Sequence, residues 1–186
     1  MSQVERVNAA WNRIEKWYAE KAPDIELGAV AAAADITAVE THLGLALPEE
    51  LKASLMRHNG VKNWPRGELL SVGRIKNDWD DYADLLDEGT FDDILGKEND
   101  FIQKCWWNKL WVPIDADGNG NLTFLDLNPG SKGVVGQVIY MDQEEGPSLP
   151  LFADFAAYLE NTAEMLEGGK YVQAGHGNYT YIKEIL

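Results

Sequence analysis

The stretch from Leu110 to Asp142 constrains the fold most, because strand-forming apolar runs alternate there with segments suited to turns. The runs read LWVPI, LTFLDL and GQVIYMD, and they are separated by DADGNGN and NPGSKGVVG. Gly, Asn, Asp and Pro dominate the separating segments, and these residues are typical of tight turns. The pattern therefore predicts a meander of three strands.

Helical patterns lie on both sides of this meander. Near the N-terminus, apolar residues recur at three- and four-residue spacing, namely Val4, Val7, Trp11, Ile14 and Tyr18. Such a stripe predicts an amphipathic helix that ends before Pro23 and packs on the core, although it is also suited to form a groove for a partner. A last helix is expected over Ser148–Leu166, terminated by Gly168 and Gly169. The tail after it is too short to assign to a strand or a helix.

Two further helices are expected before residue 60. Thr37 and Glu40 have the spacing of a capping box, so a helix is predicted to begin at Thr37 and to stop at Gly44. Pro48 favours the first turn of the next helix, which Asn59 and Gly60 are expected to end. His58 then lies in the last turn of that helix, where it suits the helix dipole better than metal binding or catalysis.

An acidic segment interrupts the pattern after a strand predicted over Glu68–Ile75. Between Asp78 and Asp100, ten acidic residues face one lysine. Apolar residues are interspersed with these charges, namely Trp79, Tyr82, Leu85, Leu86, Phe91, Ile94, Leu95, Phe101 and Ile102. We therefore expect a folded acidic insertion of two short helices, at about residues 76–104.

Length and charge limit the classes of function. A chain of 186 residues suits one domain with its own core, and a net charge of −15 repels nucleic acids and anionic lipids while it attracts basic proteins. The N-terminus has no apolar signal-peptide core, and no apolar run approaches the roughly 20 residues of a membrane span. We expect a cytoplasmic protein without direct contact to membrane or nucleic acid. The single cysteine, Cys105, is expected to be a buried thiol.

The segment Asp115–Asp126 resembles a calcium-binding loop, with Asp115, Asp117, Asn119 and Gly120 at suitable positions. A calcium loop of that kind needs flanking helices, whereas both flanks here have strand character. Asp, Asn and Gly are equally suited to a tight hairpin. We therefore expect a hairpin without metal, and the calcium reading remains the alternative.

The chain carries no common catalytic motif. His42, His58 and His176 are scattered without a nucleophile beside them in sequence. Adjacent acids such as Asp80 with Asp81, or Asp92 with Asp93, would suit acid–base catalysis, but in a charged run they are more typical of a solvated face. We expect no enzyme activity and no cofactor. The alternative is an enzyme whose catalytic cluster is assembled from residues distant in the sequence.

Short motifs in a fixed order extend from about residue 36 to about residue 160. They are Glu40-x-x-Leu43-Gly44-x-x-Leu47-Pro48, Asn59-Gly60, Trp111-x-Pro113-Ile114, Asp117-Gly118-x-Gly120-Asn121, Leu125-Asp126-Leu127-x-Pro129-Gly130, Gly136-Gln137-Val138, and the helix around Phe155–Leu159. In order and spacing this set resembles the SUKH superfamily, the group typified by the yeast cell-wall-assembly regulator. The acidic segment matches no motif of that family.

The resemblance implies a single α+β domain at residues 1–186, in which helices pack on a mostly antiparallel sheet. The motif residues would then be scaffold, with Trp111 buried, and a C-terminal extension would begin at about residue 168. Bacterial members are commonly immunity proteins that neutralise a cognate toxin, and fungal members act as regulatory scaffolds. Our first hypothesis is an immunity protein for a basic toxin domain, and the alternative is a regulatory scaffold.

Partner contacts are expected in the acidic segment, because exposed carboxylates speed encounter with a basic surface and a packed aromatic residue anchors it. The candidate partner-binding residues are Trp79, Asp80, Asp81, Tyr82, Asp84, Asp92 and Asp93. The contrary possibility is that Trp79 packs under its own segment and the carboxylates only keep the protein soluble. The toxin, the true contact surface and the oligomeric state cannot be predicted from these residues.

Overall fold

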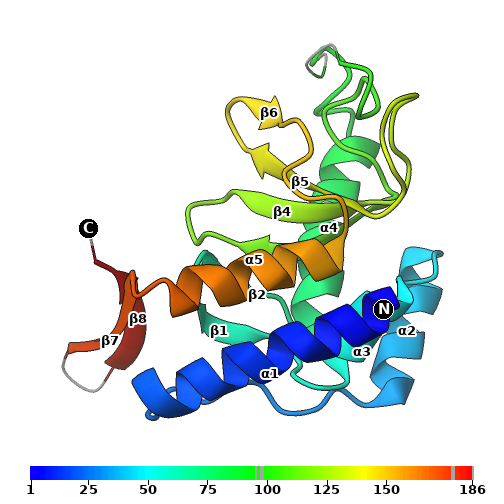
Figure 1. Ribbon diagram of the computed structural model, residues 1–186. Helices are drawn as coiled ribbons and strands as arrows, with labels where there is room; N and C mark the ends of the chain where they lie inside the picture. The colour runs from blue at the N-terminus through cyan, green and yellow to red at the C-terminus, as the bar shows by residue number, and fades with distance from the viewer. Residues whose placement is uncertain (95, 97–98, 177–178, 186) are drawn as a thin grey trace.

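The computed structural model describes residues 1–94, 96, 99–176 and 179–185, and in these residues five helices surround one main antiparallel sheet (Figure 1). The helices are α1 (Gln3–Lys21), α2 (Ala33–Leu43), α3 (Glu49–Leu55), α4 (Val72–Asp87) and α5 (Phe155–Glu167). The strands are β1 (Val61–Trp64), β2 (Gly67–Leu69), β3 (Trp111–Ala116), β4 (Leu122–Asp126), β5 (Gln137–Asp142), β6 (Gly146–Pro147), β7 (Tyr171–His176) and β8 (Tyr179–Glu184). The expected α+β class is confirmed.

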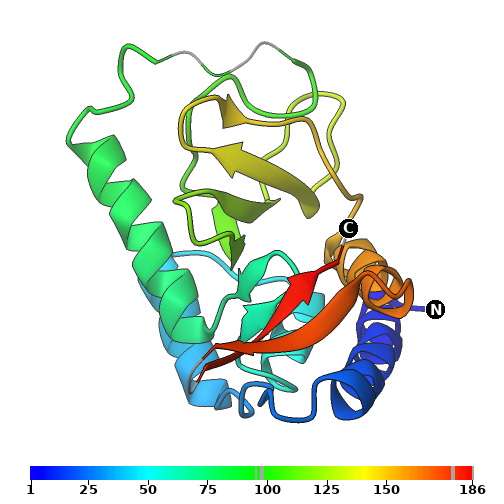
Figure 2. The same ribbon diagram turned by 90° about the vertical axis from the view of Figure 1, so that its left-hand side faces the viewer.

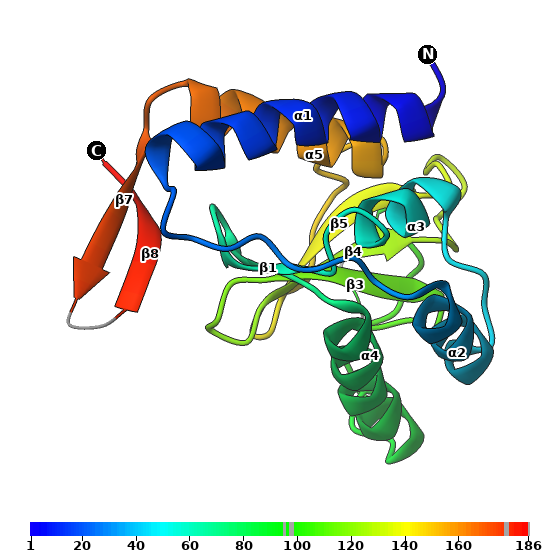
Figure 3. The ribbon, with the colours of Figure 1, turned by 90° about the horizontal axis from the view of Figure 1, so that it is seen from below.

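The main sheet contains β1 to β6 in chain order, and all neighbouring strands are antiparallel. Its centre is the meander β3, β4 and β5, as the turn-rich pattern predicts. Trp111 lies opposite Asp126, and Leu125 lies opposite Val138. Every residue of β3 and β4 is buried, because α1 and α5 cover one face of the sheet and α4 covers the other (Figure 3). Trp111 is fully buried, as expected.

Helix α1 supplies a large part of the core. Its buried residues are Val7, Ala10, Trp11, Ile14, Trp17 and Tyr18, so the predicted stripe faces the interior and the helix ends before Pro23. The side chain of Ser2 accepts a hydrogen bond from the backbone of Glu5, and the Glu5 carboxylate in turn accepts from the backbone of Ser2. This capping box fixes the start of the helix.

Helices α1 and α5 lie side by side and are joined by ion pairs (Figure 3). Arg6 contacts Asp154 and Glu160, and Arg13 contacts Glu167. The guanidinium of Arg6 is only about a quarter exposed, so these contacts lie partly within the seam between the two helices. These ion pairs therefore attach α1 to α5, the helix that follows the three-strand meander in the sequence.

Helix α2 begins four residues before the expected Thr37, so that prediction is wrong. The Thr37 hydroxyl donates to the Ala33 carbonyl inside the helix, and the Glu40 carboxylate accepts from the Leu47 amide instead of closing a capping box. The alanines before Thr37 favour helix, so α2 extends toward the N-terminus and begins at Ala33 without a side-chain cap. Its end at Gly44 is as predicted, with φ of 68°.

Helix α3 begins after Pro48 as expected but ends at Leu55, earlier than Asn59 and Gly60. The side-chain oxygen of Asn59 accepts from the Val72 amide, so this residue joins two segments and does not cap α3. His58 is also not a cap. Its Nδ1 lies 2.9 Å from the Gly28 carbonyl, and its Nε2 lies 2.8 Å from a carboxylate oxygen of Glu15.

The strand predicted over Glu68–Ile75 is only partly correct. Strand β2 ends at Leu69, and the Ser71 hydroxyl accepts from the Arg74 amide and so begins helix α4. The expected start of the insertion, near residue 76, therefore falls inside α4.

The acidic segment contains one long helix, α4, where two short helices were expected. Turns occupy the described residues that follow it, with the Asp92 amide donating to Gly89 and the Ile94 amide to Phe91. Leu95, one of the apolar residues expected to support these two helices, lies outside the described residues. In Figure 2 the described residues that follow α4 lie at the top of the molecule.

Helix α5 begins at Phe155, where the Asp154 side chain accepts from the Ala157 amide, so it starts later than the expected Ser148. It ends before Gly168 as predicted. The described part of the C-terminal extension forms a hairpin of β7 and β8, apart from the main sheet. No helix among the described residues has the length and apolar character needed to cross a membrane.

Candidate partner-binding surface

Helix α4 divides its residues between a buried face and a charged face. Val72, Ile75, Trp79 and Ala83 are spaced by three or four residues and face the core. The Trp79 ring is 8% exposed, its N–H donates to the Lys109 carbonyl, and its centroid lies 5.8 Å from that of Trp107. Trp79 therefore packs beneath the charged face and offers little surface to a partner.

Three carboxylates of α4 are held by neighbouring cations. Asp78 pairs with Arg74, and Asp87 pairs with Lys109. Asp80 contacts Lys76 and the ring nitrogen of His42. Although burial opposes its ionisation, the hydrogen bonds from Lys76 and His42 lower the pKa of Asp80. The pairs with Arg74 and Lys76 lie within α4, whereas His42 and Lys109 connect the helix to other parts of the molecule.

A second set of carboxylates is exposed and has no ion pair within the described part of the chain. Asp81, Asp84, Asp92 and Asp93 form no ion pair with another residue that the structure describes. Asp81 and Asp84 lie on α4, and the other two lie in the turns that follow it. We call these four residues the acidic surface. Their negative charge remains available to attract cations from solution or from a partner.

A pocket of about 290 Å³ lies beside the acidic surface, between α4 and the turn that joins β3 to β4. Asp81 and Tyr82 line one side, and Gly118, Gly120 and Asn121 line the other. The Tyr82 ring stacks on Trp107 with centroids 5.7 Å apart. Burial, followed by the nearby charge of Asp78, raises the pKa of the Tyr82 hydroxyl. The pocket has room for one side chain of a partner, with a carboxylate at its edge.

The β3–β4 turn is a hairpin, as predicted, and Asp117 organises it. One carboxylate oxygen of Asp117 accepts from the amides of Asn119 and Asn121, and the other accepts from the Asn121 side chain. Despite partial burial, these hydrogen bonds lower the pKa of Asp117. The Asp117 carboxylate therefore stabilises the turn by accepting hydrogen bonds from residues within it.

Asp115 belongs to the core, not to the turn. It is 3% exposed, and the Tyr158 hydroxyl donates to its carboxylate over 2.6 Å. Trp64 donates in turn to the Tyr158 oxygen. Burial raises the pKa of Asp115 to about 6. The carboxylate thus links the sheet to α5.

Asp126 joins three of the sequence motifs. Its Oδ1 accepts from the Trp111 indole and from the Asn128 amide, both over 2.9 Å, and its Oδ2 accepts from the Gln137 side chain over 2.8 Å. Burial raises the pKa of this carboxyl as well. No three His, Cys, Asp or Glu side chains in the described part of the chain gather closely enough to hold a metal ion. The motif residues are thus part of the scaffold.

His42, His58 and Cys105 are of residue types that enzymes often use for catalysis, and each has structural surroundings of its own. His42 contacts Asp80, and His58 contacts Glu15. Cys105 is partly buried, and burial raises the pKa of its thiol, which disfavours the reactive thiolate. Nothing in these contacts pairs a nucleophile with a base.

Sequence patterns missed two features of this region. The pocket beside Tyr82 forms because α4 packs against a turn more than thirty residues away, and no local motif signals that contact. The Asp115–Tyr158 hydrogen bond joins residues 43 positions apart. Both depend on tertiary packing.

The chain was compared with known proteins. The model of the SMI1/KNR4 family (SUKH-1) matches residues 31–161. A glucan synthesis regulatory protein of Neurospora crassa is 24% identical over 89% of this chain and 39% of its own length. The cell wall biosynthesis/cell cycle regulator smi1 of Schizosaccharomyces pombe is 27% identical, with 89% of this chain and 37% of that protein covered. The cell wall assembly regulator SMI1 of Saccharomyces cerevisiae is 20% identical, with coverages of 90% and 42%.

These relatives are named as regulators, not as enzymes. The chain spans about two fifths of the length of the curated relatives it matches. The family match includes α2 to α4, the main sheet and the start of α5, and it leaves α1 and the C-terminal hairpin outside. By this match over most of its length, the chain belongs to the SMI1/KNR4 family (SUKH-1).

Proposed function

We propose that this chain is a non-enzymatic regulatory module that acts by binding another protein, in the manner of a cell-wall-assembly regulator. The observation that carries the proposal is the similarity, over 89% of the chain, to proteins named as regulators of glucan synthesis and of cell wall biosynthesis. A regulatory scaffold was the alternative reading of the sequence, and the relatives favour it over an immunity protein. The proposal includes a cytoplasmic location.

The acidic surface is the part of the molecule that we assign to partner recognition. Asp81, Asp84, Asp92 and Asp93 are exposed and free of ion pairs with described residues, so a basic partner would meet charge that is not already neutralised. Tyr82 at the adjacent pocket offers a ring to an aliphatic or guanidinium group. Trp79 supports this surface from beneath.

Site-specific photo-crosslinking in the cells that make the protein tests this proposal. A photoreactive amino acid replaces Asp84 on the acidic surface, and in a matched control it replaces the exposed Glu164 on α5, which covers the opposite face of the sheet from α4. We expect a discrete protein adduct from position 84 and none from position 164. Identical adduct patterns at the two positions, or none at either, would contradict recognition through the acidic surface.

The immunity hypothesis remains a second candidate, because the net charge of −15 and its concentration around α4 suit a basic toxin. Identification of the crosslinked partner distinguishes the two functions. A toxin domain from a neighbouring reading frame would favour immunity, and co-expression should then restore growth to cells that produce the toxin. A component of wall synthesis or its signalling would favour the regulator.

A further inference from the structure

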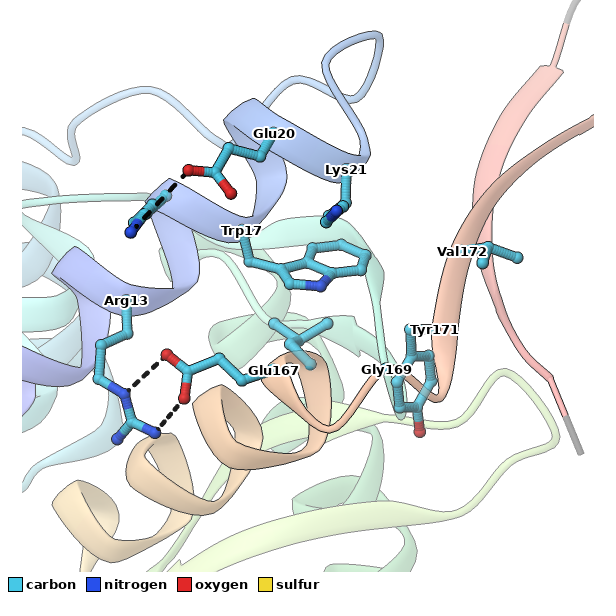
Figure 4. A pocket seen from close by; sticks show the side chains of 10 residues that line it. Arg13, Trp17, Glu20, Lys21, Glu167, Gly169, Tyr171 and Val172 are labelled. Carbon is cyan, nitrogen blue, oxygen red and sulfur yellow. Dashed lines mark hydrogen bonds and ion pairs between the residues drawn. The ribbon is translucent and has the colours of Figure 1, made fainter.

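A second pocket lies at the opposite end of the molecule, where α1, α5 and β7 meet (Figure 4). Its volume is about 410 Å³, which is in the range of sites that hold a large side chain or a small ligand. Trp17, Leu166 and Tyr171 give it an apolar lining. All residues that line it lie outside the family-matched segment 31–161. The pocket therefore belongs to the flanking parts of this chain.

The residues that line this pocket include three cations, Arg13, Lys16 and Lys21, and two carboxylates, Glu20 and Glu167. The Glu167 carboxylate is engaged by the Arg13 guanidinium, and Glu20 lies 3.9 Å from Lys16. Lys21 is exposed and forms no ion pair with a described residue. The Trp17 N–H likewise donates to no described residue. Figure 4 shows the pocket-lining cations Arg13 and Lys21 on the α1 side. A ligand that complements this rim must supply acceptors, and carboxylates supply them with the matching charge.

Strand β7 borders the pocket through a free edge. Among the described residues, β7 pairs only with β8, and no described residue of β8 lines the pocket. Tyr171 and Val172 both line it, although consecutive side chains of a strand point to opposite faces. A pocket that touches both residues therefore lies along the strand edge. Such an edge presents unpaired backbone groups to which an extended peptide can add as a strand.

We propose that this pocket holds a large apolar side chain from an extended, acidic segment of another protein, which adds as a strand to the free edge of β7. The apolar side chain fills the space above Trp17 and Leu166. Carboxylates on either side of it contact Lys21 and the neighbouring rim. Backbone pairing with β7 sets the direction of the segment.

The blocked peptide acetyl-EVFVE-amide is a direct probe, titrated into the full-length ¹⁵N-labelled protein and followed by NMR. We expect saturable shifts of the Trp17 indole N–H and of the β7 amides, with the indole signal assigned from a Trp17→Phe variant. Three altered peptides remove one feature each. Phe replaced by Ser removes the apolar side chain, Glu replaced by Lys reverses the charge, and N-methylation of both valines blocks strand pairing.

A charge reversal in the protein provides the matched pair of variants. Lys21→Glu removes a rim cation that has no ion pair among the described residues, whereas Lys62→Glu makes the same change at an exposed position of β1 that does not line the pocket. We expect Lys21→Glu to weaken binding of acetyl-EVFVE-amide about fivefold or more and Lys62→Glu to change it less than twofold. Unchanged thermal unfolding of both variants shows that the fold is kept.

Equal affinity of the two variants, or undiminished binding of the N-methylated peptide, would overturn the proposal. An absence of any saturable shift at Trp17 would overturn it as well. The inference is independent of the acidic surface at α4. Replacing Asp81, Asp84, Asp92 and Asp93 by Asn should leave peptide binding intact, so failure at one surface can be told from failure at the other.

Discussion

Aspartates have opposite roles in the β3–β5 meander and on helix α4. In the meander, Asp115 and Asp126 are buried and each accepts hydrogen bonds from aromatic side chains that hold the core. On α4, Asp81 and Asp84 are exposed and without an ion pair among the described residues. A buried carboxylate that has its donors orders its surroundings, whereas a solvated one leaves the fold unaffected and remains free to meet a partner.

This contrast separates the family motifs of the meander from the acidic surface, which lies outside those motifs. The motifs Trp111-x-Pro113-Ile114, Leu125-Asp126-Leu127 and Gly136-Gln137-Val138 converge on one carboxylate, so they specify the fold. We propose that recognition is left to parts of the chain that the motifs do not include. Substitutions in the two regions should consequently differ in what they change.

The largest loss of stability is expected for Trp111→Ala. The indole is fully buried and donates to Asp126, so its removal leaves a cavity and deprives the buried carboxylate of one of its donors. We expect a cost of about 3–5 kcal/mol in the free energy of unfolding, measured by urea denaturation. Trp111→Phe, which keeps most of the volume, should cost less. Wild-type denaturation together with lost partner binding would instead place Trp111 on the recognition surface.

The pH dependence of stability in Asp115→Asn tests the role of the buried carboxylate. A folded-state pKa of about 6, against the 3.8 of an unperturbed carboxyl, means that the folded protein holds this proton more tightly than the unfolded chain. The contribution of Asp115 to stability is thus fully present below pH 3.8 and is lost as pH rises through 6. Stability of the variant relative to wild type should therefore increase by about 3 kcal/mol between pH 3.5 and pH 7.

Urea denaturation of both proteins across this pH range measures that difference. Asp117→Asn serves as the control, because Asp117 is in the turn and its pKa is lowered. The stability of Asp117→Asn relative to wild type should therefore decrease as the pH rises. A pH-independent difference for Asp115→Asn would contradict the raised pKa.

A smaller effect is expected at the β3–β4 turn. Asp117→Ala removes the acceptor for Asn119 and Asn121 and should cost about 1 kcal/mol, measured by urea denaturation.

Calorimetric titration of wild type with calcium should give no saturable heat, because Asp115 and Asp126 are directed to core partners. Saturable micromolar binding that disappears in Asp117→Ala would restore the calcium reading.

Local patterns predicted those elements whose signals are local. The stripe of α1, the end of α2 at Gly44 and the three-strand meander follow from residue spacing and turn chemistry. The start of α2 was missed because Thr37 can cap a helix but here continues one. The strand before α4 was predicted too long because Ser71 acts as the N-cap of that helix.

The candidate surface could be predicted only in part. The acidic segment and its residues are evident from composition, but the burial of Trp79 depends on Trp107 and on the Lys109 carbonyl, which only the fold brings near. The same holds for the pocket beside Tyr82. Which carboxylates are paired also follows from three-dimensional contacts with residues such as His42 and Lys109.

The smallest change in stability, and the most direct test of the central claim, is expected when the acidic surface is neutralised. In one variant Asp81, Asp84, Asp92 and Asp93 are all replaced by Asn, and the association rate with the crosslinked partner is measured at several salt concentrations. We predict an unchanged urea midpoint, slower association and a weaker dependence of the rate on salt. A folded variant with wild-type association at every salt concentration would contradict recognition through this surface.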